Sequence, residues 1–426
     1  MRKAILTFLL IGMLGIPPLQ AQQTSGETAA ALRHARALLR SFPLIDGHND
    51  LTWSIRTSKN ARGSVEAFDL RRAATGQTDI ARLRAGQVGG QFWSVYIPGD
   101  LPDRHFAKMQ LEQIDIARRM IARYPESLAP AFSAEDAERA FRKGLIASFI
   151  GMEGGQAIEN SLGTLRAYFA LGARYMTLTH NVTLDWADAA LDSAKHNGLT
   201  PFGKEVVREM NRLGMLVDLS HVTDRTMSDA LDVSESPVMF SHSSARALTN
   251  TPRNVPDSIL ARLPRNGGVV MVTFVPEFVS SEVCVWEASL NRARAGMQDE
   301  SRRDSLRKAF AAAHPPPVAT LNQVADHIEH VRTMAGIDHV GIGSDFNGSD
   351  DMPAGLSDVS KYPMLFAELI RRGWTDADLK KLAGGNILRV LRDASRVSGR
   401  LQAVRPPSGA TIEALDAPGN LRGKGP

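Results

Sequence analysis

One short apolar run in the middle of the chain ends in a single acidic residue: it reads LIASFIGME and extends from Leu145 to Glu153. A continuous apolar run of this length is typical of a strand buried on both faces of a parallel sheet. A carboxylate at the end of such a strand loses its water, and an unpaired buried charge is costly, so we expect Glu153 to have a cation as its partner.

Seven other short apolar runs occur along the chain, separated by stretches with helical periodicity. The intervals between the runs leave room for a helix that returns the chain to a parallel neighbour. Eight such runs with intervening helices predict an α/β fold, a (β/α)8 barrel of the TIM type rather than an open sheet. The other seven strands are expected at 44–45, 91–97, 175–179, 215–219, 237–240, 268–275 and 339–343.

The remaining segments indicate one large domain. We assign residues 22–400 to the barrel and the Gly/Pro-rich residues 401–426 to a flexible C-terminal tail. The stretch 281–317 is highly charged, has helical periodicity and ends in three prolines, so we expect a helical insertion over one face of the barrel. Charge runs usually face water, so we assign this insertion no role in chemistry.

Composition and charge exclude several classes of protein. Of the 426 residues, 43% are hydrophobic and 23% are charged, which is ordinary globular usage and excludes a disordered chain, a collagen or a coiled coil. The 50 basic residues exceed the 46 acidic ones by a net charge of only +4. This excess is too small for a basic surface that binds the phosphates of a nucleic acid. We therefore expect no nucleic-acid partner.

The N-terminus has the pattern of a cleaved secretory signal. Basic residues at positions 2 and 3 precede an apolar run at 4–16, a Pro-Pro pair and the small residue Ala21, where we expect cleavage. We therefore assign residues 1–21 to a signal peptide and expect a secreted or periplasmic protein without a stable membrane anchor. The single cysteine, Cys284, cannot form an intramolecular disulfide.

Polar residues that could hold metal ions follow several of the predicted strands. In a barrel of this kind, chemistry is assembled at the carboxyl ends of the strands. His48 and Asp50 follow the first run and project from the same face of an extended chain, so both can reach one ion. His221 and His242 follow the fifth and sixth runs.

Together with Glu153, these residues provide five nitrogen or oxygen donors. Five donors exceed what one tetrahedral zinc ion needs, whereas two zinc ions that share a carboxylate would use them all. No lysine stands at a predicted strand end, so Glu153 is assigned as the bridge. Asp345, after the eighth run, could be a further ligand or a proton carrier, and His180 and Arg253 also lie in strand-end loops.

These motifs together resemble the membrane dipeptidase (renal dipeptidase) family of zinc peptidases. The resemblance extends in order from about residue 43 to residue 392 and consists of several independent motifs. They are IDGHND at 45–50, GMEG at 151–154, LTHN at 178–181, DLSH at 218–221, SHS at 241–243, RN at 253–254 and GSDF at 343–346.

The resemblance implies a (β/α)8 barrel with two zinc ions per chain that hydrolyses dipeptides, including those with a C-terminal D-residue. It implies that His48 and Asp50 bind one zinc ion, that His221 and His242 bind the other, and that Glu153 bridges them. It further implies three roles in catalysis and substrate binding. These are contact with the reacting carbonyl for His180, pairing with the substrate's C-terminal carboxylate for Arg253, and proton transfer for Asp345.

Two positions depart from the family pattern. Asn347 stands in DFNG where the family often has DFDG, which removes a charge beside Asp345. Phe278 falls where some members have a tyrosine that helps to hold the substrate carboxylate, and a phenyl ring cannot donate a hydrogen bond. The insertion at 281–317 is also longer than the corresponding loop of compact members, so substrate preference can differ.

The expected function is therefore that of an exported zinc dipeptidase, in which a water activated by two metal ions attacks the peptide bond. Two alternatives stay open at this point. One is an amidohydrolase that acts on N-acyl amino acids or lactams with the same site, and the other is a non-catalytic exported barrel that binds a ligand. The sequence also leaves open whether the chain forms a homodimer.

Overall fold

Eight parallel strands close into a barrel in the computed structural model, which describes residues 19–74, 76–297 and 299–417. The barrel closes because β1 pairs with both β2 and β9, while β2 pairs with β4. The predicted (β/α)8 fold is confirmed. The strands are β1 (Leu44–Asn49), β2 (Val88–Ser94), β4 (Ile146–Glu153), β5 (Ala173–Thr177), β6 (Leu216–Asp218), β7 (Met239–Phe240), β8 (Val269–Val272) and β9 (Val340–Ile342).

A further short strand, β3 (Leu128–Pro130), lies outside the closed ring and was not expected from the sequence. It pairs in parallel with the first residues of β4, from Leu128 opposite Ile146 to Pro130 opposite Ser148. Three residues are too few to produce a recognisable apolar run, and the proline at the end has no backbone N–H to donate to the neighbouring strand.

Helices surround the barrel and begin where the sequence supplies caps. In α7, for example, the Thr200 side chain accepts a hydrogen bond from the backbone of Gly203, and Gly214 ends the helix with φ of 82°. The helices before the insertion are α1 (Leu19–Ser41), α2 (Leu51–Thr57), α3 (Ile80–Ala85), α4 (Phe106–Arg123), α5 (Ala134–Arg142), α6 (Leu162–Ala170), α7 (Pro201–Leu213), α8 (Asp224–Val233), α9 (Asp257–Leu260) and α10 (Leu263–Asn266). Those after it are α14 (Leu321–Ala335), α15 (Tyr362–Arg371), α16 (Asp376–Lys380) and α17 (Asn386–Val404).

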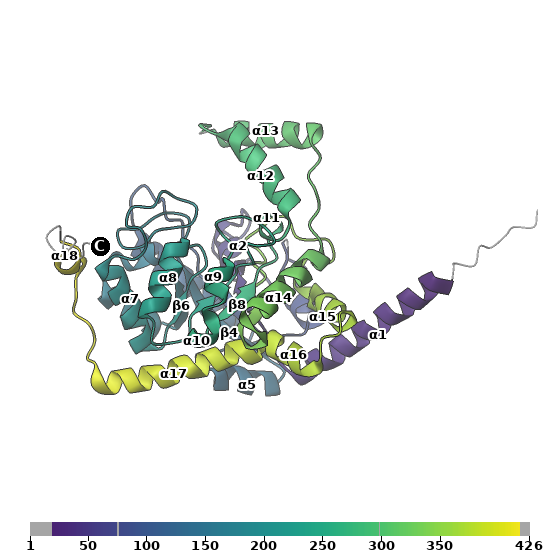
Figure 1. Cartoon of the computed structure of the whole chain (residues 1–426), viewed down its shortest axis with the longest axis horizontal. Helices are drawn as coiled ribbons and strands as arrows, with labels where there is room; N and C mark the ends of the chain where they lie inside the picture. The colour runs from purple at the N-terminus through teal and green to yellow at the C-terminus, as the bar shows by residue number, and fades with distance from the viewer. Residues whose placement is uncertain (1–18, 75, 298, 418–426) are drawn as a thin grey trace, which may run out of the picture.

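The charged insertion follows β8 and is helical. It consists of α12 (Ser281–Arg294) and α13 (Glu300–Ala313), preceded by the single-turn helix α11 (Pro276–Val279). Figure 1 shows α12 and α13 standing apart from the barrel, on the side opposite α17. Because α11 follows the carboxyl end of β8, this loop borders the end of the barrel at which a site is expected.

The C-terminal end of the described chain has more regular structure than the expected flexible tail. The tail expected from residue 401 begins inside α17, and Ser408 accepts a hydrogen bond from Arg166 through its carbonyl oxygen at 2.9 Å. The short helix α18 (Ile412–Leu415) follows. At the other end, residues 1–18 of the expected signal peptide lie outside the described residues. None of the described helices is both long and apolar enough to cross a membrane.

The interior of the barrel is filled by apolar side chains beneath the strand ends. Phe92 and Phe149 stack with their ring centroids 4.5 Å apart, and Tyr175 packs against Phe92 at 5.5 Å. All three side chains are fully buried. This layer closes the barrel from below and leaves Tyr175 directly under the strand-end polar residues.

Candidate metal centre

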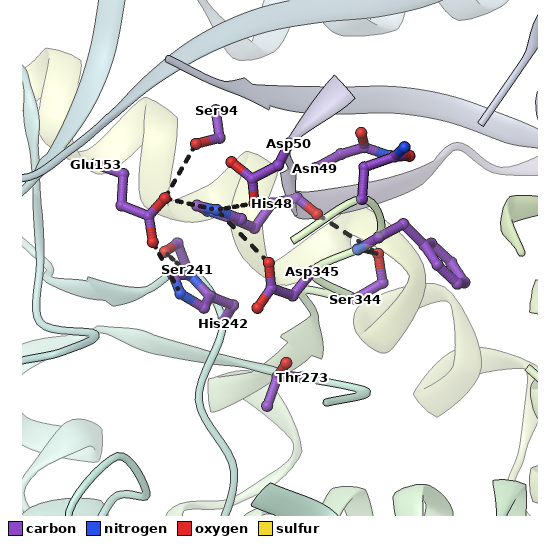
Figure 2. A network of polar contacts seen from close by, with 12 residues as sticks. His48, Asn49, Asp50, Ser94, Glu153, Ser241, His242, Thr273, Ser344 and Asp345 are labelled. Atoms are coloured by element: carbon purple, nitrogen blue, oxygen red, sulfur yellow. Dashed lines mark hydrogen bonds and ion pairs between the residues drawn. The ribbon is translucent and has the colours of Figure 1, made fainter. Parts of the chain in front are cut away.

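The five predicted metal ligands come together at the carboxyl end of the barrel. His48 is near the end of β1 and Asp50 follows that strand, Glu153 is the last residue of β4, and His221 and His242 lie just beyond β6 and β7. All five are at most 6% exposed. Figure 2 shows four of them, His48, Asp50, Glu153 and His242, lying close together. The structure therefore brings these five side chains together, and their role as metal ligands stays a prediction.

The two oxygen atoms of Glu153 face two different groups of side chains. Oε2 lies 3.3 Å from Nε2 of His48. Oε1 lies 3.0 Å from Nε2 of His221 and 3.3 Å from Nε2 of His242. A carboxylate in this position can ligate one ion with each oxygen.

Two further residues border these groups. Nε2 of His48 lies 3.2 Å from Asp50 Oδ2 and 3.9 Å from Asp345 Oδ1. Nε2 of His180 lies 3.9 Å from Glu153 Oε1. Three overlapping triplets could each hold an ion: His48 with Glu153 and His242, Glu153 with His180 and His221, and His48 with Asp50 and Asp345. Geometry alone thus admits Asp345 and His180 as ligands as well.

The donor atoms suit metal ions. Among the described residues, His48 Nε2 and Asp50 Oδ1 are buried without a hydrogen-bond partner. Buried polar atoms are rarely left without a hydrogen bond, so these two atoms indicate a partner that is not part of the chain. Imidazole and carboxylate groups are the ligands that zinc and similar divalent ions take in proteins. The residues present therefore fit a metal centre.

A second set of side chains orients the three imidazole rings. Nδ1 of His48 contacts the Tyr175 hydroxyl at 2.8 Å, and Nδ1 of His221 donates to Asn181 Oδ1 at 2.9 Å. Nδ1 of His242 contacts Ser241 Oγ at 2.8 Å. Each bond turns the opposite nitrogen, Nε2, toward Glu153. Sequence analysis gave none of these supporting residues a role, although two of them stand in the motifs at 178–181 and 241–243. They are Tyr175, Asn181 and Ser241.

Burial and neighbouring charges set the protonation of the site. Burial lowers the pKa of His221 and of His242 well below the ordinary value, so both rings are neutral, which is the form that ligates metal. Burial opposes ionisation of Glu153, but the interactions with His48, His221 and His242 outweigh it and lower its pKa well below normal. Burial likewise opposes a charge on His48, yet Tyr175 and the adjacent carboxylates raise its pKa, so positive charge is favoured there.

Asp345 differs from the other acids of the site. Burial, together with the charges of Asp50 and Glu153, raises its pKa well above the ordinary value despite the opposing effect of His48. Its backbone has φ of 65°, a strained conformation for a residue with a side chain. A Cβ atom on Gly348 would lie 2.1 Å from Asp345 Oδ1, so only glycine fits at that position.

Two buried carboxylates hold the strand-end loops together. Asp46 accepts hydrogen bonds from the backbone of His48 at 3.1 Å and of Ser344 at 2.9 Å, which ties the β1 loop to the β9 loop. Asp218 accepts from the backbone and the hydroxyl of Ser241 at 2.8 and 2.6 Å, which ties β6 to the His242 loop. Burial raises the pKa of both acids, although these hydrogen bonds oppose the shift.

A cavity of about 430 Å³ opens beside these groups. Arg253 lines it, is only 2% exposed, and has Nη1 buried without a hydrogen-bond partner among the described residues. The guanidinium lies 5.0 Å from the ring centroid of Phe278, and burial lowers its pKa to about 10, so it stays charged at neutral pH. His180 lines the opposite part of the wall, with its ring 4.7 Å from that of Tyr96.

Fold and site together define a metal-dependent hydrolase built on a (β/α)8 barrel. Residues 32–405 match the family model described as membrane dipeptidase (peptidase family M19). The chain belongs to this family and is a metallo-dipeptidase, as the sequence motifs predicted.

Several solved structures are similar to this chain. A probable dipeptidase, PvdM, from Pseudomonas aeruginosa is 26% identical with a TM-score of 0.76, and the match covers 87% of this chain and 99% of that one. Dipeptidase AC, a metallo peptidase of family M19, is 25% identical with a TM-score of 0.69 over 83% and 98% of the two chains. A metallo peptidase from Rhodobacter sphaeroides, liganded with a phosphinate mimic of L-Ala-D-Ala, is 24% identical with a TM-score of 0.69 over 83% and 99%.

Proposed function

We propose that this protein is an exported dipeptidase that holds two zinc ions per chain, bridged by Glu153, and cleaves dipeptides including those with a C-terminal D-residue. The observation that carries the proposal is the position of Glu153, whose two oxygens face separate groups of donors. His48 and Asp50 would hold one ion, and His221 and His242 the other. When bound, such ions polarise a peptide carbonyl and lower the pKa of water.

The chain's own residues hold and orient the substrate. Arg253 presents an unpaired, buried guanidinium to the cavity and binds the free C-terminal carboxylate, a pairing that is strong when water is excluded. His180, on the other part of the wall, donates a ring N–H to the carbonyl oxygen of the scissile bond. Because Arg253 closes one end of the site, substrates are short and have a free C-terminus.

Asp345 is the proton carrier in this proposal. Its carboxyl group lines the cavity, 3.9 Å from His48 Nε2, and is held there by the tight backbone turn before Gly348. It takes a proton from the attacking water and delivers it to the nitrogen of the leaving amino acid. The leaving nitrogen must then lie between Asp345 and Arg253.

Two observations support dipeptides as the substrate class. The site accepts a dipeptide by volume, since its cavity measures about 430 Å³. The Rhodobacter sphaeroides relative was solved with a mimic of L-Ala-D-Ala, and we extend this ligand class to the present chain. Export is supported only by the pattern of residues 1–21, and N-terminal sequencing of the mature protein from a native host tests it.

A substrate panel on purified protein tests the catalytic part. Chelated protein should be inactive, and two equivalents of zinc per chain should restore hydrolysis of L-Ala-L-Ala and L-Ala-D-Ala but not of N-acetyl-L-alanine. Restoration by one equivalent would contradict the binuclear site. Preferential hydrolysis of N-acetyl-L-alanine would favour the amidohydrolase alternative instead.

A further inference from the structure

A second cavity of about 710 Å³ adjoins the cavity at the metal centre. Four residues line both cavities: Val275, Glu277, Gly348 and Ser349. The second cavity continues between the charged insertion, represented by Trp286 and Arg307, and the loop after β9. Residues of α11 and α12 line it, and Figure 1 shows these two helices above the barrel. The two cavities therefore border each other at these four residues.

The position of this space relative to the substrate follows from the shared residues. Glu277 precedes Phe278, over which the Arg253 guanidinium lies, and Asn254 Nδ2 donates to the Phe278 carbonyl at 2.8 Å, so α11 is fixed beside the arginine. Gly348 is in contact range of Asp345 on the other side. Under the proposed function, the C-terminal residue of a dipeptide lies between Arg253 and Asp345. Its side chain therefore faces the second cavity.

The charges of this second cavity are mostly negative. Four acids and a single base line it: Glu277, Glu287, Asp350, Asp351 and Arg307. The base is already paired, with Nη1 3.2 Å from Glu287 and Nη2 3.4 Å from Asp351. Glu277 makes no ion pair or hydrogen bond within the described chain, and it is half-buried at the junction of the two cavities. Glu277 is thus a carboxyl group without an ion-pair partner at the junction, next to the C-terminal residue. Burial and the charge of Glu287 raise its pKa, and the positive charge of Arg253 opposes this shift.

The rest of the wall is apolar. Trp286 packs edge-on against Phe310, with ring centroids 5.4 Å apart, and Pro316 and Pro317 line the same space. A long side chain with a methylene stem and a cationic end suits such a surface, because the stem can lie on apolar atoms while the end meets a carboxylate. A neutral side chain would leave Glu277 unpaired, and an acidic one would be repelled.

We propose that this enzyme prefers dipeptides whose C-terminal residue carries a cationic side chain, such as lysine, arginine or ornithine, and that Glu277 determines this preference. The inference rests on the proposed function and specifies its substrate class. The buried, unpaired guanidinium of Arg253 in the adjoining cavity independently indicates that a carboxylate ligand is anchored there.

The test compares L-Ala-L-Lys with L-Ala-L-norleucine, its neutral counterpart of similar shape, and repeats both with the C-terminal D-residue. We expect kcat/KM of the wild type to be on the order of tenfold higher for the lysine substrate of whichever stereochemistry is cleaved, and the ratio to shrink as salt is raised. L-Ala-L-Glu should be the poorest substrate of the series.

Two variants test whether Glu277 causes the preference for the lysine substrate. Glu277→Gln should bring the lysine-to-norleucine ratio close to one while norleucine hydrolysis persists. Glu282→Gln removes the same charge from an exposed position on α12 outside the cavity lining and should keep the wild-type ratio. Circular dichroism melting confirms that each variant is folded.

The outcomes separate this inference from the function on which it rests. Equal kcat/KM for the lysine and norleucine substrates in the wild type overturns the inference and leaves the dipeptidase proposal intact. A tenfold ratio that survives in Glu277→Gln overturns the assignment to Glu277. Absence of hydrolysis of every dipeptide by the zinc-loaded wild type overturns the proposed function and the inference with it.

Discussion

Individual carboxylates at the strand ends have different surroundings, and these surroundings separate their roles. Glu153 contacts three imidazole rings, so it stays ionised although it is buried. Burial and the charges of two other acids raise the pKa of Asp345 well above the ordinary value. Two acids whose pKa values are driven in opposite directions within one site are typical of a division between ligand and proton carrier.

Replacement of Asp345 tests that division. Asp345→Asn keeps the shape of the side chain but cannot exchange a proton, so we expect kcat to fall by about 10³-fold. Metal content, measured by elemental analysis, should stay at the wild-type value because the five predicted ligands are all retained. If the variant also loses a metal ion, Asp345 is a ligand.

Arg253 can be tested by its effect on substrate binding. Arg253→Ala removes the charged group that we expect to pair with the substrate carboxylate, so KM for L-Ala-D-Ala should rise by about 100-fold, in line with ~3 kcal/mol for charge-assisted hydrogen bonds. Arg253→Lys keeps the charge without the planar fork and should give an intermediate KM. An unchanged KM in the alanine variant would remove the basis for this role.

At the scale of elements, the strands supply not only ligands but also support for ligands on other strands. Tyr175 of β5 contacts His48 of β1, and Asp218 of β6 bonds Ser241, which in turn contacts His242 after β7. The ring of strands therefore fixes the imidazole orientations collectively. A change in one strand should be measurable as a change in the metal affinity of a ligand on another.

Tyr175→Phe isolates one of these cross-strand contacts. The variant keeps the buried ring but removes the hydroxyl that orients His48, so we expect zinc affinity to fall by 10- to 100-fold in a chelator competition titration. Tyr168→Phe is the matched control, since its hydroxyl is also buried but donates to the Ala157 carbonyl outside the centre. Equal losses of affinity in both variants would assign the effect to general destabilisation.

Helix α14 holds the loop that follows His242 through a buried histidine. His327 Nδ1 accepts a hydrogen bond from the backbone of Ala245 at 3.0 Å, and Nε2 lies 3.3 Å from the Val279 carbonyl oxygen. The first of these bonds requires a neutral ring, and burial lowers the pKa of His327 from 6.5 to about 4. The folded state therefore binds fewer protons than the unfolded state between these two pH values.

Acidification should consequently weaken the fold in a defined window. As pH falls from 6.5 toward 4, the free energy of unfolding should drop by about 3 kcal/mol from this residue alone. Denaturant titrations across this range should show a shallower pH dependence in His327→Gln. His34→Gln, which changes a histidine with 47% exposure on α1, should keep the wild-type slope. Identical slopes in the wild type and His327→Gln would contradict the prediction.

At the scale of the whole molecule, the metal centre joins parts of the chain that are far apart in sequence. Its five predicted ligands come from loops after β1, β4, β6 and β7, and Asp345 follows β9. Without cations, His48 Nε2 and Asp50 Oδ1 are buried and unpaired. The ions should therefore stabilise the closed barrel as well as support catalysis.

Removal of metal should lower the thermal stability. We expect exhaustive chelation to reduce Tm by on the order of 10 °C, because ions that bind only the folded state stabilise it by mass action. Calorimetry before chelation, after it and after zinc is returned measures the effect. A Tm that does not depend on metal would show that the hydrogen bonds around Asp46 and Asp218 suffice to hold the site.

The local sequence determined the eight strands of the barrel and the residues that could bind metal, because apolar runs and strand-end acids and histidines are properties of consecutive residues. It did not reveal β3, which is too short to have a pattern of its own, or the support of His48 by Tyr175, which depends on the register between strands. Only the tertiary structure decided that the two oxygens of Glu153 face different histidines and that Glu277 lies at the junction of two cavities. Both features arise from barrel closure, which brings distant loops to one end and sets the direction of each side chain there.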